Sequence, residues 1–507
     1  MRRSLRRWLF GSAAAGVSCA ALVGVGACRP YDCNDWVSCE PPPPCEPDPA
    51  VAPAEDRCGV FVSSSAGKDE GPGTRAQPVL TMERAIALAQ AGPMRVYACA
   101  EAFLEPVVVP AGVEVWGGLD CAKDWNYLGG NSKTVIAPAA GTTPLRFEAG
   151  GGTSVVADMR AEAADAAVPS GSSIAAMVMQ GAAVEILRSE LIAGDGAPGA
   201  NGRDGGSSPA QTGVAGADGG NACSADVVPG GTSVTRDCGG LTSAGGQGGQ
   251  GTITAPGDGQ PGEPAPVPNP GGFGAGGLGQ RSAVALCTVG VEGDLGAAGM
   301  HGDGGRGAGR LSLAGWEGEA GKDGGNGLPG QGGGGGGASL GGAMLCGNNQ
   351  ARGGAGGGSG GAGGCGGRGG KGGGYGGASI GLLNLGTQVA IRMSTIVTSN
   401  GGDGGNGGLR QAGGLGGVGG LGGAGSNAVQ PGCHGGEGGR GGNGGNGGGG
   451  AGGSSIGIAH VFGLPVTQEG VIIQVGLPGR GGLGGNPGIP GSAGEDGLRS
   501  GMLPFPQ

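Results

Sequence analysis

Glycine occupies 137 of the 507 positions and is arranged largely in Gly-Gly-X triplets. The clearest run covers residues 435–453, GGEGGRGGNGGNGGGGAGG, in which a glycine recurs at every third position. A segment with so few side chains cannot bury an ordinary apolar core. It must pack backbone against backbone or stay unfolded, and this choice limits what the chain can become more than any other feature.

Three conformations compete for the glycine-rich runs. Disorder is favoured by the large entropy that glycine loses on folding. A collagen helix needs abundant proline, which is sparse here, and long period-three runs, which are interrupted. A polyglycine II bundle needs only bare edges, because a threefold helix leaves two edges of a Gly-Gly-X chain free to form N–H···O bonds with its neighbours. We predict the third, with X residues on outer faces or packed against the strands; in one run these are Asp403, Asn406, Leu415, Val418 and Leu421. In these runs the chain resembles glycine-rich repeat proteins of the PGRS type.

Residues 1–27 have the pattern of an export signal, with four arginines followed by an uncharged stretch rich in Ala, Gly, Leu and Val. This stretch ends in Val-Gly-Ala-Cys28, which resembles a bacterial lipobox. The resemblance implies that the Cys28 thiol carries diacylglycerol and that Cys28 becomes the first residue after cleavage. Arg29 follows, whereas an Asp there would favour retention in the inner membrane of Gram-negative bacteria. The resemblance therefore implies an outer-membrane lipoprotein, which we expect at the cell surface.

Two other fates of the N-terminal segment stay open. Val25-x-Ala27 also suits ordinary signal peptidase, which would give a secreted protein, and an uncleaved stretch would be a weakly apolar membrane anchor. Arg6-Arg7 faintly resembles a twin-arginine signal, so the export route is open as well. Loss of residues 1–27 removes four arginines and no acids, which changes the net charge from −10 to −14. This charge argues against nucleic acid as a partner.

The cysteine count agrees with export. Of the 14 cysteines, Cys19 lies in the signal and Cys28 would carry lipid, which leaves an even set suited to disulfides outside the cytoplasm. Zinc is the alternative, but the sequence has no C-x2-C pair. Two local pairs are predicted, Cys99–Cys121 and Cys223–Cys238. The remaining members of the set are Cys33, Cys39, Cys45, Cys58, Cys287, Cys346, Cys365 and Cys433.

Short apolar runs begin after residue 58. Residues 67–78, GKDEGPGTRAQP, are rich in turn formers, and Thr81 is placed to cap a helix that ends near Ala91. Strand-like runs follow at close spacing, too close for helical crossovers. They cover residues 95–100, 106–109, 113–116, 134–137 and 145–148.

This stretch resembles the amino-terminal part of right-handed parallel β-helix proteins of the pectin-lyase-like group. The resemblance covers less than a fifth of the chain and implies a capping helix followed by the first coils, without specifying an activity. The residues that carry it are Gly67, Gly71, Pro72, Gly73, Thr74, Pro78, Val96, Tyr97, Ala98, Cys99, Glu105 and residues 112–118 (GVEVWGG).

A repeat links the apolar runs to the glycine-rich ones. Three units open with Ser-Ile, at Ser173, Ser379 and Ser455, and each continues with apolar residues and a Gly three positions before a Val. Alternation of this kind predicts strands with one buried face. We therefore predict an all-β fold, a right-handed parallel β-helix with inserted polyglycine II-like excursions. Its predicted segments are 1–27 (signal peptide), 28–57 (lipidated cysteine and Pro-rich tether), 58–170 (cap and first coils) and 171–507 (coils with glycine-rich insertions).

Motifs for chemistry are nearly absent. Gly-x-Gly-x-x-Gly matches arise by chance in a Gly-Gly-X polymer, and the three histidines are far apart. Trp116 and Trp125 are candidates for stacking on a sugar, with packing in the core or cap as the alternative. The charged residues of the best strands offer no paired carboxylates at i,i+2, so we expect no catalysis, no metal and no cofactor. Those residues are Glu185, Arg188, Glu190, Arg392 and Glu469.

The sequence thus predicts a cell-surface lipoprotein with a structural or adhesive role. Its expected partners are the membrane, through the lipid, and surface glycans or neighbouring cells. The alternative is a β-helix protein that binds or cleaves polysaccharides.

Overall fold

The computed structural model describes residues 44–347, 351–426, 428–486 and 488–506. The chain divides into two units, Met1–Cys45 and Glu46–Gln507, and the described helices and strands all belong to the second. The predicted signal peptide and Cys28 lie outside the described residues, as do Cys33 and Cys39.

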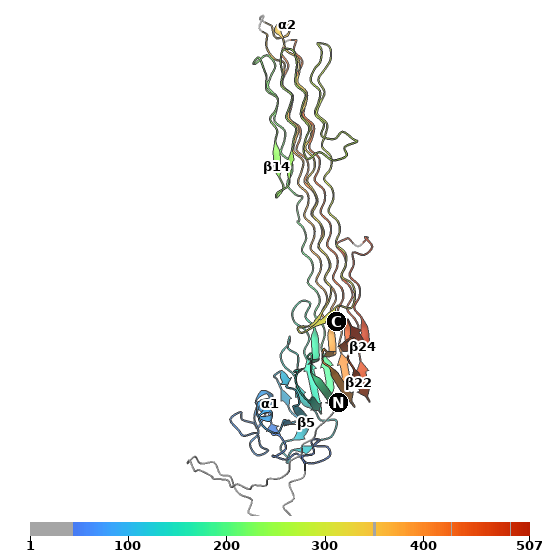
Figure 1. Cartoon of the computed structure of the whole chain (residues 1–507). Coiled ribbons are helices and arrows are strands. Elements are labelled where there is room, and N and C mark those ends of the chain that lie inside the picture. The colour runs from blue at the N-terminus through green and yellow to red at the C-terminus, as the bar shows by residue number, and fades with distance from the viewer. Residues whose placement is uncertain (1–43, 348–350, 427, 487, 507) are drawn as a thin grey trace, which may run out of the picture. The chain divides into compact units, whose positions relative to one another are not determined.

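Most strands belong to three sheets of parallel strands, which together we call the strand body (Figure 1). Sheet 1 contains, in order, β1 (Val60–Val62), β2 (Arg95–Cys99), β5 (Glu114–Asp120), β9 (Thr153–Ala157), β12 (Ala183–Leu187), β19 (Gln388–Arg392) and β22 (Val466–Glu469), with β6 (Asn126–Tyr127) antiparallel to β5. Sheet 2 contains β3 (Ala102–Phe103), β7 (Thr134–Ile136), β10 (Met159–Ala163), β13 (Glu190–Ala193), β20 (Thr395–Thr398) and β23 (Ile472–Gln474). Sheet 3 contains β4 (Val107–Val109), β8 (Leu145–Phe147), β11 (Ser173–Val178), β18 (Ser379–Asn384), β21 (Ser455–Val461) and β24 (Arg499–Phe505).

The predicted fold class, an all-β right-handed parallel β-helix with polyglycine II-like excursions, is wrong in its architecture. The finding that overturns it is the division of the strands among several separate sheets, with no closed solenoid among the described residues. The physical reason lies in the length of the strands, which run for only two to seven residues. Turns such as those at Gly112 (φ 77°) and Gly181 (φ 87°) then send the chain to a different sheet.

The repeat read from the sequence sets the register of sheet 3. Ser173 pairs with Ser379, and Ser379 pairs with Ser455, so the three Ser-Ile units lie in consecutive strands. Apolar side chains therefore stack in columns through the strand body. In sheet 1 the column formed by Val115, Val156, Ile186 and Ile391 is at most 1% exposed. Full burial of each such side chain stabilises the fold by about 1.5–3 kcal/mol.

Helix α1 (Met82–Gln90) covers the first strands, as predicted from the sequence. The Thr81 hydroxyl accepts a hydrogen bond from the Arg84 backbone N–H and caps the helix. The apolar positions recur at helical spacing, so one face packs on the core while the other meets water. The buried residues of that face are Met82, Ala85, Ile86 and Ala89.

Three glycine-rich segments leave the strand body and return to it. They connect β13 to β18 (residues 194–378), β20 to β21 (399–454) and β23 to β24 (475–498), so each one joins sheet 2 to sheet 3. We call their side-by-side chains the glycine bundle (Figure 1). Within the first segment lie two antiparallel hairpins and one short helix. They are β14 (Thr235–Asp237) with β15 (Thr242–Ala244), β16 (Arg310–Ser312) with β17 (Gly315–Glu317), and α2 (Ala343–Cys346).

Candidate functional surface: the glycine bundle

Backbone hydrogen bonds with a period of three connect the glycine-rich chains. The N–H groups of Gly402, Gly405 and Gly408 donate to carbonyls of residues 377, 374 and 371, each at 2.8 Å. The preceding glycines of the same run, at 401, 404 and 407, donate to a different chain, at residues 477, 480 and 483. Successive residues thus bond different neighbours, as expected for bare edges of a threefold chain. A pass from residue 196 to residue 220, at about 3.1 Å per residue, spans roughly 75 Å.

The bundle leaves no room for side chains on its inner edges. A Cβ built on Gly361 would lie 2.0 Å from the carbonyl oxygen of Gly417, and one on Gly360 would lie 1.8 Å from that of Gly333. Real Cβ atoms essentially never approach other atoms within 3.0 Å. Where an X residue faces the interior it is small, as with Ser359 and Ala362, which are both fully buried. Glycine is therefore required by the packing of these chains.

Asp and Asn side chains at X positions hydrogen-bond neighbouring chains. The Asp195 Oδ1 accepts the backbone N–H of Asn400 at 2.7 Å, and the Asn400 Oδ1 in turn accepts that of Leu477 at 3.0 Å. The same relay recurs two triplets further on. There the Asn201 Oδ1 accepts from Asn406, and the Asn406 Oδ1 accepts from Leu483, each at 2.8 Å. These oxygens satisfy N–H groups that no backbone carbonyl reaches.

Two histidine side chains accept backbone N–H groups of neighbouring chains, as these Asp and Asn side chains do. The Nδ1 of His301 accepts the backbone N–H of Asn446 at 2.9 Å, and the Nδ1 of His434 accepts that of Gly422 at 3.1 Å. Both rings therefore serve as acceptors between chains. Sequence reasoning missed the structural role of Asp, Asn and His here, and the signal that could have found it was their placement at X positions of the triplets.

Disulfides join distant passes of the chain. Cys223–Cys346, Cys238–Cys365 and Cys287–Cys433 connect residues 123, 127 and 146 positions apart in the sequence. The predicted pair Cys223–Cys238 is therefore wrong: Cys238 lies at the turn of the β14–β15 hairpin, which packs against the chain that holds Cys365. The predicted pair Cys99–Cys121 is present in the strand body. Cys45 and Cys58 are disulfide-bonded as well.

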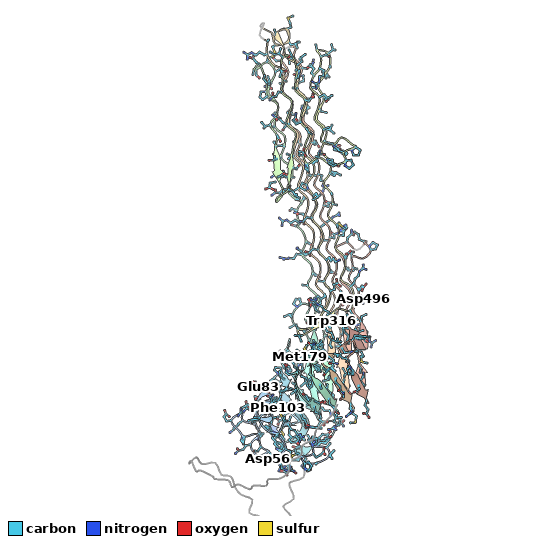
Figure 2. All side chains as sticks on the ribbon, viewed as in Figure 1. Asp56, Glu83, Phe103, Met179, Trp316 and Asp496 are labelled. Atoms are coloured by element: carbon cyan, nitrogen blue, oxygen red, sulfur yellow. A yellow bond between two sulfur atoms is a disulfide. The ribbon has the colours of Figure 1, made fainter. Side chains whose placement is uncertain are left out.

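The outer edges of the bundle carry the longer X side chains. Figure 2 shows side chains crowded over the strands and sparser along the glycine-rich chains. On the chain of residues 400–424, an apolar row projects outward, in which each side chain is 55–60% exposed. Its members are Leu409, Leu415, Val418 and Leu421. Asp403 and Asn406 continue this edge and are exposed too, so all five X residues named from the sequence lie outside.

Three of the charged strand residues named from the sequence, Glu185, Arg392 and Glu469, are paired with one another. The Arg392 guanidinium contacts Glu185 at 2.5 Å and Glu469 at 3.5 Å, across three neighbouring strands of sheet 1. Glu190 lies elsewhere, 3.8 Å from Arg160 on sheet 2. These ion pairs lie on the outer faces of the sheets. Each of these carboxylates is paired with an arginine, and no two of them are arranged for general acid–base catalysis.

Arg188 belongs to a buried ionic cluster. Its guanidinium binds Asp158, whose side chain is 1% exposed, and also binds Asp48 in two hydrogen bonds of 2.9 Å. Lys133 and the Tyr127 hydroxyl complete the partners of Asp158. Burial, together with the hydrogen bond to the Asp158 carboxylate, raises the pKa of Tyr127 to about 12. The cluster ties Asp48, in the predicted tether, to the strand body.

Both tryptophans proposed for sugar stacking are packed inside. Trp116 is 5% exposed and its Nε1 donates to Glu114, while Trp125 is 4% exposed and its Nε1 donates to the Arg75 carbonyl. Trp125 also meets the Phe61 ring edge-on, with centroids 4.8 Å apart. Both rings are therefore packed in the core or cap, the alternative to sugar stacking that the sequence left open.

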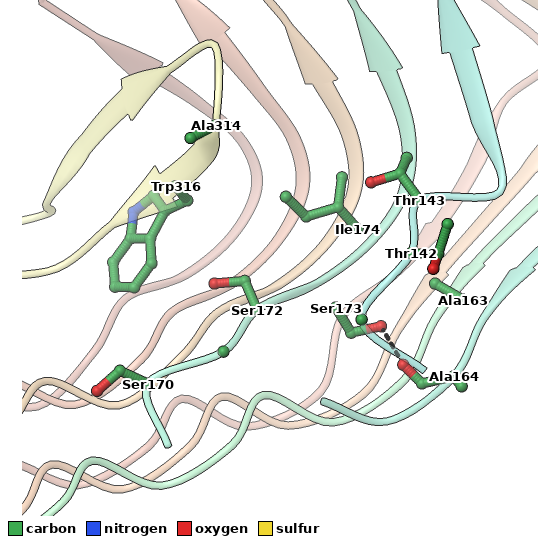
Figure 3. A pocket seen from close by; sticks show the side chains of 12 residues that line it. Thr142, Thr143, Ala163, Ala164, Ser170, Ser172, Ser173, Ile174, Ala314 and Trp316 are labelled. Atoms are coloured by element: carbon green, nitrogen blue, oxygen red, sulfur yellow. Dashed lines mark hydrogen bonds between the residues drawn. The ribbon is translucent and has the colours of Figure 1, made fainter. Parts of the chain in front are cut away.

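Two cavities among the described residues offer few groups suited to catalysis. One of about 230 Å³ lies between the β16–β17 hairpin and sheet 3, where Trp316 and Ile174 face a row of hydroxyls that includes Ser172 (Figure 3). Another, of about 560 Å³, lies beside Cys238–Cys365. Its carboxylate, Asp237, accepts the N–H groups of Gly239 and Gly240.

Neither a metal cluster nor a membrane-crossing helix occurs among the described residues. They hold no group of three or more His, Cys, Asp or Glu placed to ligate a metal ion. No helix in that part of the chain is long and apolar enough to cross a membrane. Comparisons with family models, with curated proteins and with solved structures gave no match. The resemblance of the glycine-rich runs to PGRS-type proteins stays a prediction.

Proposed function

We propose that this chain is an exported lipoprotein of the cell surface, with a structural or adhesive role carried by the glycine bundle. The observation that supports the role most directly is that different parts of the bundle hold it together and form its surface. Backbone hydrogen bonds and disulfides hold the chains together, while the longer X side chains face outward. Outer side chains can then vary without disturbing the interior, which suits a surface that contacts glycans or neighbouring cells.

Resistance to proteases is a further consequence of this construction. A protease binds its substrate as an extended segment, which requires local opening of the chain. In the bundle such opening breaks hydrogen bonds to several neighbours at once, and disulfides limit how far a pass can separate. A protein built this way suits an oxidising, protease-rich exterior.

Membrane attachment is tested with Cys28→Ala, and Cys19→Ala serves as the matched control inside the signal segment. We expect the native chain and Cys19→Ala to partition with membranes, to incorporate labelled fatty acid and to accumulate as precursor under globomycin. Cys28→Ala should lose all three properties. Membrane partitioning and labelling that survive Cys28→Ala would refute the lipid anchor.

The surface role is tested separately, in whole cells that express the chain. Protease added outside should cleave the exposed hairpin turns before the glycine-rich passes, and only after reduction should it degrade the passes. The adhesive role predicts that cells carrying the chain bind glycan-coated surfaces or one another better than cells without it. Equal adhesion by both would leave a purely structural role, and full protection of the chain in intact cells would refute surface exposure.

A further inference from the structure

In the described part of the chain, the strand body is covered by a helix at its first strands and is uncovered at its last strands. The sheets begin with β1, β3 and β4 and finish with β22, β23 and β24. At the first side α1 buries Met82 and Ile86 against the core, which keeps water from the apolar columns. We call the other side, formed by β22, β23 and β24, the open end; Figure 1 labels β22 and β24 there.

The open end exposes both backbone and apolar side chains. Within the described residues no strand pairs with the outer edges of β22, β23 and β24. Met502 of β24 is 42% exposed and continues the buried column of Leu382 and Ile458. Ile473 of β23 continues the column of Ile396 and is only partly buried against the same core. Unpaired strand edges with apolar side chains are sites of association with another chain. Pro504 removes one N–H donor from β24, but it leaves the rest of the seven-residue strand unprotected.

The chemistry of the open end limits what can cover it. Its N–H and C=O groups need partners that present the same groups in extended conformation. A single added strand would satisfy one of the three edges and leave the others in water. A second open end presents three strand edges and a matching centre, in which Met502 and Ile473 are apolar and Gln468 is polar.

We propose that the open end is the dimerisation surface of this chain, with a second copy packed against it across a two-fold axis. The axis passes through the middle of β24, so the two copies of β24 pair antiparallel with Met502 at the centre. The same rotation places β22 of each copy against β23 of the other. A two-fold interface is self-complementary in this way.

The charges at the open end are compatible with this arrangement. Arg499 begins β24, and antiparallel pairing therefore places its two copies at opposite ends of the shared ladder. Glu469 ends β22, which faces β23 (Ile472–Gln474), a strand without acidic residues. No like charges are brought together there, so charge repulsion does not oppose the burial of Ile473 and Met502.

A charge exchange at Met502 tests the dimer. The full chain carries Cys28→Ala in every sample, so that lipid cannot contribute, and its mass is measured by sedimentation velocity and light scattering. We expect a dimer at micromolar concentration. Met502→Lys and Met502→Glu each bring two like charges together and should raise the dissociation constant at least about tenfold, whereas a mixture of the two should restore a dimer.

Leu415→Lys is the matched control, since it adds the same charge to an exposed apolar side chain of the glycine bundle. It should leave the dimer intact. Ile473→Glu provides a second test on a different strand in case a Met502 variant fails to fold, which its melting curve would reveal. A monomeric native chain, a Met502→Lys variant that stays fully dimeric, or loss of the dimer with Leu415→Lys would each overturn the proposal.

Discussion

A single methyl group added inside the glycine bundle tests the packing directly. In Gly361→Ala the new Cβ would lie 2.0 Å from the Gly417 oxygen, so one chain must move by about 1 Å to reach an acceptable contact. The Gly417 N–H donates to the Ala362 carbonyl of the Gly361 chain (2.8 Å), and the Gly417 carbonyl accepts the N–H of Gly438 on a third chain (2.8 Å). A shift of that size lengthens both bonds beyond the normal range.

The expected cost adds two contributions. Overpacking costs about 1–3 kcal/mol, and each lost backbone bond costs about 0.5–1.5 kcal/mol, which gives roughly 2–6 kcal/mol in all. For a cooperative unit of this size, about 1 kcal/mol lowers the melting temperature by about 1 °C. Calorimetry of Gly361→Ala should therefore show a melting temperature lower by about 2–6 °C.

Two controls separate packing from the change of residue type. A Cβ on Gly151 meets nothing within 4 Å, and Val418→Ala shortens an exposed side chain of the chain that Gly361 touches. Both Gly151→Ala and Val418→Ala should melt within about 1 °C of the native protein, because neither adds a buried contact. A Gly361→Ala variant that melts like these controls would refute the close packing of the chains.

Three further predictions concern ionic and covalent links. Arg188→Ala removes the hydrogen bonds of a cation to buried Asp158, which keeps Lys133, and should lower the free energy of unfolding by about 1.5–3 kcal/mol in urea titrations; an effect under about 0.5 kcal/mol would contradict the ionic cluster. Hydrogen bonds from a lysine ammonium and a backbone N–H lower the pKa of Asp323 below its ordinary 3.8, so its contribution to stability is present above that value and is lost as the pH falls through the folded pKa. Asp323→Asn should thus be less stable than the native chain by at most about 1 kcal/mol at pH 7 and equal to it near pH 2; a gap that persists in acid would contradict this. Replacing both members of Cys223–Cys346 by serine removes a link across 123 positions and should speed proteolysis near α2 severalfold, and unchanged digestion would show that the link carries no stability.

The sequence predicted local features better than the assembly. Thr81 and the apolar spacing after it located α1, and the repeated Ser-Ile units predicted strands that prove to lie in register at Ser173, Ser379 and Ser455. The arrangement of those strands in several sheets was not predicted, because a period-two pattern reports a buried face and not which strand lies beside it.

In the glycine-rich region, too, the sequence predicted local conformation but not which chains are neighbours. Triplet periodicity predicted bare edges and outward X residues, but it could not tell which passes become neighbours. The sequence predicts a bond from Cys238 to its nearest cysteine, Cys223, whereas its partner Cys365 lies on a pass 127 residues away. The acceptor role of Asp195 and Asn201 could not be predicted either, since it depends on a chain about 200 positions further on.

The shared backbone bonds of the glycine bundle are tested most directly by amide hydrogen exchange of the oxidised protein, followed by mass spectrometry of peptides from residues 401–425 and 435–453. Bonds such as that from Gly405 to Gly374 predict slow exchange of the bonded N–H groups in these peptides, with protection that falls when the disulfides are reduced. Exchange of these peptides at the rate of an unstructured chain would contradict the ordered bundle.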